Sequence, residues 1–160
     1  MKPKTDKTNA MRILEQKGIP FEVMTYPHGD EAVDGVTVAK LLGQDPDRVY
    51  KTLVAQGASR QYYVFDIPVA EELDLKKTAK AVGEKSIVMV HVKELFGLTG
   101  YVRGGCSPIG MKKQFFTTFQ EEAQLYDTIA VSGGKIGCQV ILNPLELAEL
   151  VEGQFADVIK

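Results

Sequence analysis

Short apolar segments of two kinds follow one another along this chain, and their order limits the folds that it can adopt. Runs of β-branched, aromatic and aliphatic residues predict strands at residues 21–26, 48–55, 61–67, 86–90, 127–132 and 137–143. Helical spacing predicts helices at residues 6–17, 36–42, 75–82, 92–97 and 145–152. The order lacks the regular alternation of a doubly wound parallel sheet. We therefore expect a mixed α/β fold with a curled, largely antiparallel, barrel-like sheet flanked by helices.

Residues that start or stop helices and turns support these boundaries. Gly18 and Gly83 follow helical segments and suit the left-handed position that ends a helix. Asp74 is a suitable N-cap, and Pro144 stands at or just before the first turn of the last helix. The linker Q-G-A-S-R has the length and the glycine of a hairpin loop, so residues 48–67 should form a hairpin.

The size and charge of the chain fit one soluble domain spanning residues 1–160. A chain of 160 residues buries enough surface to fold without a disulfide or a structural metal. Its net charge of -2 argues against nonspecific coating of nucleic acid. An apolar leader and a membrane-length apolar run are both absent from the sequence. We expect a cytoplasmic protein with no membrane segment, in which Cys106 and Cys138 remain thiols.

The stretch V-Y-K-T-L-V places Lys51 inside an otherwise apolar strand. An unpaired ammonium group is costly to bury, so either the side chain reaches water or an anion comes to it. Side chains alternate between faces along a strand, so Lys51 shares its face with Val49 and Leu53. This placement favours a fixed positive charge near the mouth of a curled sheet.

The segment from Gly100 to Lys113 is rich in glycine and predicts a loop whose backbone can approach a ligand and offer it N–H groups. A bulged turn between strands remains the structural alternative. The spacing from Gly105 to Gly110 imitates a P-loop, but Met111 stands where the lysine of that motif belongs. Cys106 in this loop is either a nucleophile or a small packed side chain.

A second glycine-rich segment, V-S-G-G-K-I-G, contains Ser132 and Lys135 at the S-x-x-K spacing of some acyl-transfer enzymes. A glycine-rich hairpin explains it equally well. His28 and His91 are the only histidines, and neither lies in a zinc-binding spacing, so we expect no metal. The acidic residues near position 30 are interpreted as solvated surface.

Basic residues concentrate in or beside the segments just described. Such a distribution could give an acidic protein one positive face for a polyanion, although an ordinary solvated surface remains the alternative for any single lysine. The basic residues are Lys76, Lys77, Lys80, Lys85, Arg103, Lys112, Lys113 and Lys135.

Taken in order, F-E-V-M-T-Y-P-H, V-Y-K-T-L-V, L-D-L-K-K-T-A-K-A-V-G, G-G-C-S-P-I-G and V-S-G-G-K-I-G resemble the YbaK/EbsC family over nearly the whole chain. The resemblance implies the fold of the editing domain found in many prolyl-tRNA synthetases. It also implies a deacylase for mischarged aminoacyl-tRNA that uses no cofactor. In the YbaK branch the substrate is Cys-tRNA(Pro), and Cys-tRNA(Cys) is a further candidate.

The resemblance also implies roles for individual residues. Lys51 would meet the terminal nucleotide or the aminoacyl group, and the backbone of Gly104 would hold the substrate near the reacting carbonyl. Tyr26 would lie beside the terminal nucleotide or the aminoacyl group, and Ser132 beside the amino-acid side chain. Further pocket positions are Gly105, Cys106, Ser107, Pro108, Gly110, Gly133, Gly134 and His28. Phosphates of the tRNA would meet Lys76, Lys77, Lys80 and Lys113.

Substrate assistance would make a protein nucleophile unnecessary, because the cysteine thiol of the substrate could attack its own activated ester. Family members commonly carry a branched aliphatic residue where this chain has Cys106, which favours packing for that thiol. A deacylase for another small residue, such as Ala-tRNA(Pro), and a noncatalytic tRNA-binding module remain alternatives. Prolyl-tRNA synthetase is the partner that the resemblance implies.

Overall fold

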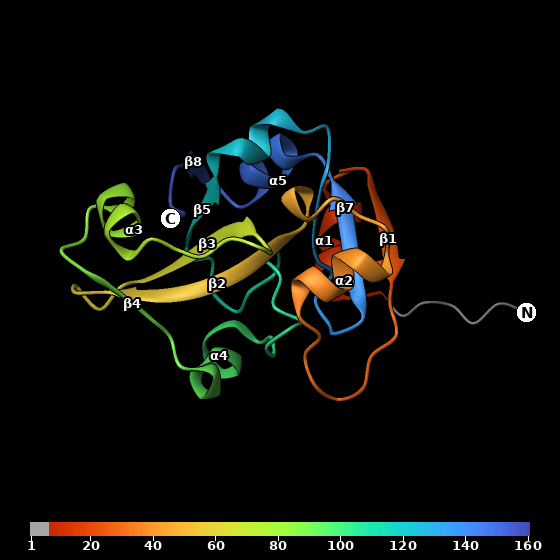
Figure 1. Cartoon of the computed structure of the whole chain (residues 1–160), viewed down its shortest axis with the longest axis horizontal. Coiled ribbons are helices and arrows are strands. Elements are labelled where there is room, and N and C mark those ends of the chain that lie inside the picture. Colours follow the sequence, from red (N-terminus) through yellow and green to blue (C-terminus); the bar gives the residue numbers. More distant parts are fainter. Residues whose placement is uncertain (1–6) are drawn as a thin grey trace, which may run out of the picture.

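The computed structural model describes residues 7–160, and its elements are labelled in Figure 1. The strands are β1 Phe21–Thr25, β2 Tyr50–Gly57, β3 Tyr62–Pro68, β4 Ile87–Met89, β5 Phe116–Gln120, β6 Ile129–Ser132, β7 Cys138–Leu142 and β8 Gln154–Ala156. The α-helices are α1 Asn9–Gln16, α2 Gly35–Leu41, α3 Leu75–Val82, α4 Val92–Thr99 and α5 Pro144–Leu150, and the 3-10 helices are η1 Pro46–Arg48 and η2 Glu121–Leu125.

The described strands form two sheets that meet near the start of β2. One has the order β4-β2-β3-β5-β8 and the other the order β1-β7-β6. A bridge between Val49, the residue before β2, and Ala130 of β6 crosses the boundary. Four of the six strand pairings are antiparallel, whereas β5 runs parallel to both β3 and β8. The prediction of a mixed, largely antiparallel α/β fold is confirmed, but the pairing among the described strands does not close a barrel.

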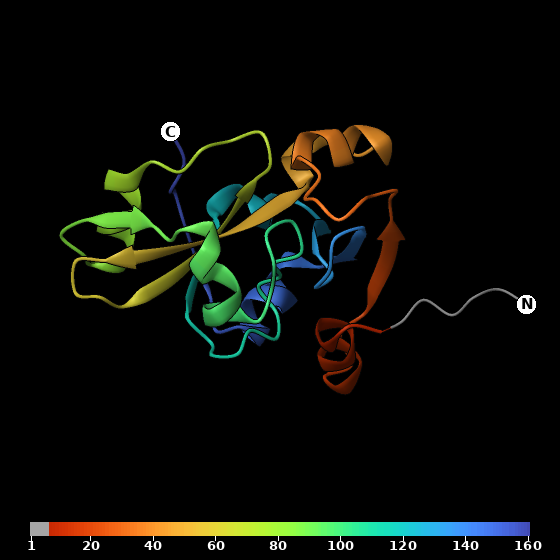
Figure 2. The ribbon, with the colours of Figure 1, turned by 90° about the horizontal axis from the view of Figure 1, so that it is seen from below.

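Helices cover the sheets on several sides, as Figures 1 and 2 show. On one face of the β2–β3 hairpin, Ala79 of α3 packs with Phe65 and Ile67. On the other face, Val54 and Val64 pack with the glycine-rich segment that follows α4. Helices α1 and α5 pack against the three-stranded sheet, and α2 packs over the junction between the two sheets. Residues 50–54 of β2 therefore lie at the centre of the molecule.

The local signals in the sequence act as expected where the structure describes them. The side chain of Asp74 accepts hydrogen bonds from the first turn of α3, and Gly83 ends that helix with a φ of 75°. Thr8 caps α1, so this helix begins later than predicted, and Asp6 lies outside the described residues. Pro144 occupies the first turn of α5. Residues 7–160 contain no helix with the length and apolar character of a membrane span.

Some predicted boundaries shift, and two strands are new. Asp45 caps the turn η1, so β2 begins at Tyr50 instead of residue 48 and continues to Gly57. Strand β5 was not predicted, although it lies between β3 and β8 in the larger sheet. Strand β8 was not predicted either, since it has only three residues. Both strands depend on partners distant in sequence, which local patterns do not reveal.

Candidate active site

A pocket of about 1060 Å³ lies between β2, the segment before and within α2, helix α4 and the glycine-rich segment that follows it. Strand β4 pairs only with residues 55–57 of β2, so the first half of β2 presents an edge there that β4 does not cover. Helices α2 and α4, both labelled in Figure 1, contribute residues to the pocket lining. The four residues assigned to catalysis from the sequence all line this pocket: Tyr26, Lys51, Gly104 and Ser132.

Lys51 is half-buried in the wall of the pocket. Within residues 7–160, the ion pairs are Lys7–Glu15, Lys77–Asp157 and Lys160–Glu72, and none of them involves Lys51. The side chain is thus partly buried and has no carboxylate within ion-pair distance among the described residues, so its charge is available to an anionic ligand. Arg103 also lines the pocket, from an exposed position.

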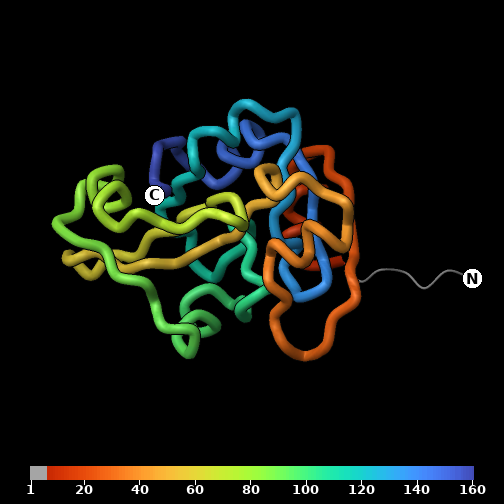
Figure 3. The backbone as a smooth tube through the Cα atoms, in the orientation of Figure 1, coloured from red at the N-terminus to blue at the C-terminus, as the bar shows by residue number. Residues whose placement is uncertain are grey.

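Gly104 is held by contacts that no other residue would allow. Its φ is 84°, and a Cβ built on it would lie 2.6 Å from the Cβ of Ala32. A Cβ on the neighbouring Gly105 would lie 3.0 Å from backbone atoms of Lys135 and Ile136. The segment before α2 and the β6–β7 turn therefore both close against this glycine pair, and Figure 3 shows the path of the three segments.

Not every backbone N–H of this segment can serve a ligand. The N–H of Gly105 donates to the carbonyl of Val102 over 3.0 Å, and the N–H of Ile109 donates to Ser107 Oγ over 3.2 Å. Gly104 and Cys106 both line the pocket. Neither of their N–H groups has a hydrogen-bond partner among the described residues, so both remain able to donate.

Tyr26 and Ser132 enter the pocket from the three-stranded sheet. The backbone N–H of Tyr26 donates to the carbonyl of Gly137 over 3.0 Å, which ties the end of β1 to the β6–β7 turn. The hydroxyl of Ser132 accepts a hydrogen bond from the N–H of Gly134 over 3.1 Å. The Ser132 hydroxyl is therefore held by its own turn.

Cys106 lines the pocket but behaves as a packed thiol. Burial, and secondarily the nearby charge of Asp66, raises the pKa of Cys106 to about 12, against a smaller opposite effect of a hydrogen bond with Thr99. Its neighbours in the core include Val54 and Tyr101. Since the thiolate is the nucleophilic form, this environment favours the packing role.

Seven residues assigned to substrate binding lie outside the pocket lining: Gly105, Ser107, Pro108, Gly110, Gly133, Gly134 and His28. Several of them hold the loops in place instead. Ser107 is fully buried. A Cβ on Gly110, whose φ is 79°, would contact Asn9 and Tyr101, and His28 packs against Gly137. Ser107 and Gly110 therefore contribute to the packing of the segment that follows α4 and not to the pocket surface.

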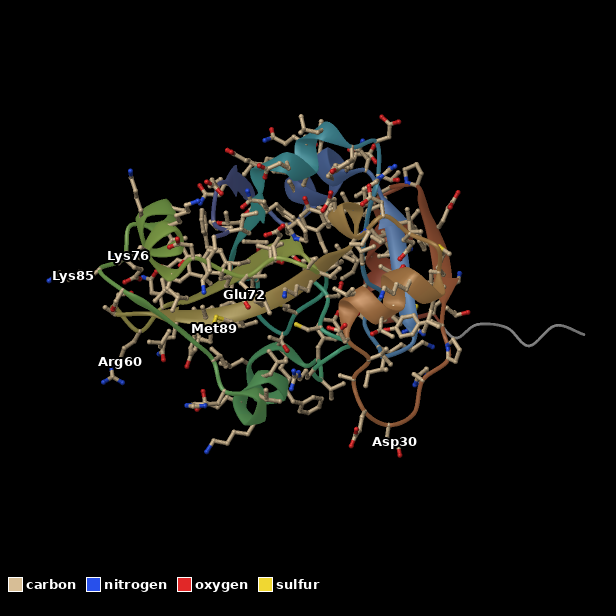
Figure 4. The ribbon with its side chains drawn as sticks, viewed as in Figure 1. Asp30, Arg60, Glu72, Lys76, Lys85 and Met89 are labelled. Carbon is tan, nitrogen blue, oxygen red and sulfur yellow. The ribbon has the colours of Figure 1, made fainter. Side chains whose placement is uncertain are left out.

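The basic residues assigned to tRNA do not gather beside the pocket. In Figure 4, Lys76 and Lys85 lie at the end of the molecule opposite Asp30, whose loop borders the pocket. Lys77 donates to Asp157 over 2.9 Å and to the carbonyl of Ile159 over 2.8 Å, so its ammonium group already has partners. Lys80 is exposed on α3, whereas Lys113 lies in a separate hollow with Arg60 and Tyr62.

Sequence reasoning missed two features of the site. Asp30, Glu31 and Asp34 were interpreted as solvated surface, but they are exposed at the pocket itself. Asp66 on β3 is fully buried, and its carboxylate is hydrogen-bonded to Thr52 in the pocket wall. An aspartate inside the apolar stretch Y-Y-V-F-D-I-P carries the same signal as Lys51 inside its strand.

Two kinds of comparison place this geometry among known proteins. Solved structures that superpose on the chain include one described as a proposed trans-editing enzyme for prolyl-tRNA synthetase, with a TM-score of 0.82, 24% identity, and coverage of 97% of this chain and 99% of the other. The hypothetical protein APE2540 superposes with a TM-score of 0.83 at 21% identity, over 93% of this chain and 97% of the other. These likenesses show the fold.

Sequence similarity is more specific. EbsC of Enterococcus faecalis (strain ATCC 700802 / V583), named as a proposed Cys-tRNA(Pro)/Cys-tRNA(Cys) deacylase, is 48% identical over 152 residues, which cover 95% of this chain and 93% of EbsC. The model of the aminoacyl-tRNA editing domain matches residues 30–150, which include Lys51, Gly104 and Ser132. The chain therefore belongs to the aminoacyl-tRNA editing domain family, as the resemblance to YbaK/EbsC proteins predicts.

Proposed function

We propose that this protein is a trans-editing deacylase that hydrolyses the ester of mischarged Cys-tRNA(Pro), and of Cys-tRNA(Cys) as a further substrate. The observation that carries the proposal is the convergence of Tyr26, Lys51, Gly104 and Ser132, from three separate parts of the fold, on one pocket. The name of the 48% identical EbsC supports the same reaction. The substrate is already activated, so positioning and oxyanion stabilisation can supply much of the catalysis.

In the proposed reaction the thiol of the substrate attacks its own ester carbonyl. A carbon–sulfur bond forms, and the carbonyl oxygen becomes an oxyanion near the N–H groups of Gly104 and Cys106. The carbon–oxygen bond to the ribose then breaks, and the proton of the thiol ends on the ribose hydroxyl. The products are intact tRNA and a cysteine thiolactone, which water opens afterwards.

The protein's side chains have supporting roles in this scheme. Lys51 contacts either the terminal phosphate or the reacting ester. Its ammonium group has no carboxylate partner among the described residues, and its position in the pocket wall is compatible with either contact. Tyr26 lies beside the terminal nucleotide, and Ser132 lies beside the side chain of the amino acid. The high pKa of Cys106 and the hydrogen bond that Ser132 accepts both suit a reaction without a protein nucleophile.

The choice of tRNA requires further contacts. A chain of 160 residues has little surface for reading an anticodon in addition to holding the acceptor end, so we propose that prolyl-tRNA synthetase is a partner and that the protein acts in the cytoplasm. The superposing structure described for prolyl-tRNA synthetase supports that partnership. Exposed lysines on α3, such as Lys76 and Lys80, are proposed to contact phosphates of the tRNA.

A deacylation panel tests the proposal. Purified protein is incubated with cysteinyl, alanyl, seryl and prolyl tRNA, and with Cys-tRNA(Pro) alkylated at its thiol. Rapid hydrolysis of the cysteinyl ester, with little of the alkylated or seryl ester, is the expected result. Faster hydrolysis of alanyl-tRNA would show that water attacks the ester and that the substrate thiol is not required. Tight, salt-sensitive tRNA binding without any turnover would instead identify a noncatalytic binding module.

A further inference from the structure

Asp66 is a buried acid for which the proposed reaction has no use. It lies opposite Thr52 in the β2–β3 pairing, so the two side chains share one face of the hairpin. Its side chain is 0% exposed. Asp66 Oδ1 lies 2.5 Å from Thr52 Oγ1, while Asp66 Oδ2 is buried without a hydrogen-bond partner among the described residues. An orphaned oxygen of this kind is unusual, because buried polar atoms normally have partners.

The surroundings of Asp66 contain no compensating charge. No ion pair of the described chain includes it. The titratable groups whose charges couple to it are Cys106 of the glycine-rich segment and Tyr50 of β2, and burial raises the pKa of both, so that both are neutral near pH 7. Phe119 lies opposite it on β5. Burial raises the pKa of Asp66 to about 7, against the opposing effect of the Thr52 hydrogen bond.

Thr52 connects this acid to the pocket. It is half-buried, lines the pocket and follows Lys51 directly in the chain. A threonine hydroxyl has one proton to donate and two lone pairs. When Asp66 is ionised, that proton is held by the carboxylate, and Thr52 can only accept a hydrogen bond from the pocket. When Asp66 is protonated, its own O–H can donate to Thr52 Oγ1, and the threonine proton becomes available to a substrate oxygen.

We infer that Asp66 is a positioning residue, which donates a hydrogen bond to Thr52 and thereby turns the Thr52 hydroxyl into a donor to an ester or ribose oxygen of the bound aminoacyl end. The inference rests on the proposed deacylase function, since it assigns a substrate oxygen as the acceptor. Thr52 and Lys51 leave β2 on opposite faces, and both line the pocket, so they would contact different parts of the same substrate. The proton that Asp66 holds is not consumed in the reaction, so atoms balance as in the scheme above.

The test is the pH dependence of kcat/KM for Cys-tRNA(Pro) between pH 5.5 and 8.5, with spontaneous ester hydrolysis subtracted, in three variants beside the wild-type protein. D66N keeps a donor of the same shape at every pH, T52S keeps the hydroxyl, and T52V removes it while keeping the volume. All variants act on the same substrate thiol, so we expect the ratio of wild-type or T52S activity to D66N activity to fall severalfold as pH rises through about 7. T52V should be at least roughly tenfold slower than wild type at low pH, and its ratio to D66N should not show that fall.

A second measurement separates this inference from the proposed function. Carboxyl ¹³C chemical shifts of the full chain are followed against pH in wild type, D66N and T52V. One carboxyl should titrate near neutral pH in the wild type and be absent from D66N. The midpoint of its titration should move in T52V. A ratio of wild-type to D66N activity that stays constant across this pH range, or T52V activity equal to wild type, overturns the inference while leaving deacylation intact. Absence of wild-type deacylation at every pH overturns the proposed function and the positioning role together, even if the carboxyl titrates as expected.

Discussion

Gly104 and Ala32 both line the pocket and are in direct contact, although 72 positions separate them in the sequence. The contact is so close that a Cβ on Gly104 would lie 2.6 Å from the Cβ of Ala32, and the backbone of Gly104 has a φ of 84°. Both features require glycine. The residue that we propose to hold the substrate is therefore fixed by the segment that borders the pocket before α2.

Replacing Gly104 by alanine should damage the site. The added methyl group meets Ala32 and strains the backbone, so we expect G104A to lose most deacylase activity and about 1–3 kcal/mol of stability. Initial rates of deacylation and urea unfolding measure the two effects. Gly97 on α4 is the matched control, because nothing lies within 4 Å of a Cβ built there; G97A should be active and slightly more stable. Full activity in G104A would remove this glycine from the site.

Cys106 should tolerate an aliphatic replacement. It is a buried thiol whose pKa is raised to about 12, so it contributes packing and no thiolate at neutral pH. We expect C106V to keep most of the deacylase activity and to lose no more than about 1–3 kcal/mol of stability, since valine adds about one methyl group to a packed site. A loss as large as that of K51A would show that the sulfur takes part in the reaction.

Stability should depend on pH through Asp66. Burial raises its pKa from 3.8 to about 7 in the folded protein, so the folded state binds the proton more tightly than the unfolded state. This group's contribution to the free energy of unfolding is greatest below about pH 4 and is lost progressively as pH rises to about 7. The loss is a few kcal/mol at most, since one pKa unit corresponds to about 1.4 kcal/mol.

Chemical denaturation at several pH values measures that slope. D66N cannot ionise, so the part of the slope between about pH 4 and 7 that belongs to Asp66 should be absent from it. An identical slope in D66N and the wild type would mean that the ionised carboxylate is compensated in the folded protein.

The lysines of α3 should not contribute equally to tRNA binding. Lys76 and Lys80 are exposed on α3, whereas the ammonium group of Lys77 is already bonded to Asp157 and to the carbonyl of Ile159. We expect K76A and K80A each to weaken tRNA binding and to lower the slope of log K against log salt by about 0.7–0.9. K77A should change the slope less. Lys17 at the end of α1 is a control position, and slopes that match K17A for all three variants would place the tRNA elsewhere.

Local structure was predictable from the sequence where a few neighbouring residues determine it. Asp74, Gly83 and Pro144 act within one helical turn, and the Q-G-A-S-R hairpin joins adjacent strands. The parallel pairing of β5 with β3 was not predictable in this way, because its partners lie more than 45 residues apart and no turn connects them. The division into two sheets follows from the same long-range pairing.

The residues of the candidate site divide in the same way, into those that neighbouring residues identify and those that depend on distant packing. Lys51 was identifiable because a charge inside an apolar strand requires an explanation, and Asp66 carries the same signal on the neighbouring strand. Asp30, Glu31 and Asp34 were interpreted as solvent-exposed surface. Nothing in the sequence indicates that Ala32 packs on Gly104 and so places their loop at the pocket. Ser107 and Gly110 belong to the glycine-rich motif but are packed outside the pocket lining. Only the three-dimensional packing distinguishes them from the residues that line the pocket.

The central claim is that the uncompensated charge of Lys51 acts on the aminoacyl end of tRNA. Single-turnover hydrolysis of Cys-tRNA(Pro) by wild type, K51A and K85A tests it most directly, with Lys85 serving as an exposed lysine at the far end of the molecule. The account predicts that K51A loses roughly 100-fold or more in rate while its circular dichroism and melting temperature stay unchanged, and that K85A remains close to wild type. Wild-type hydrolysis by a folded K51A protein would contradict it.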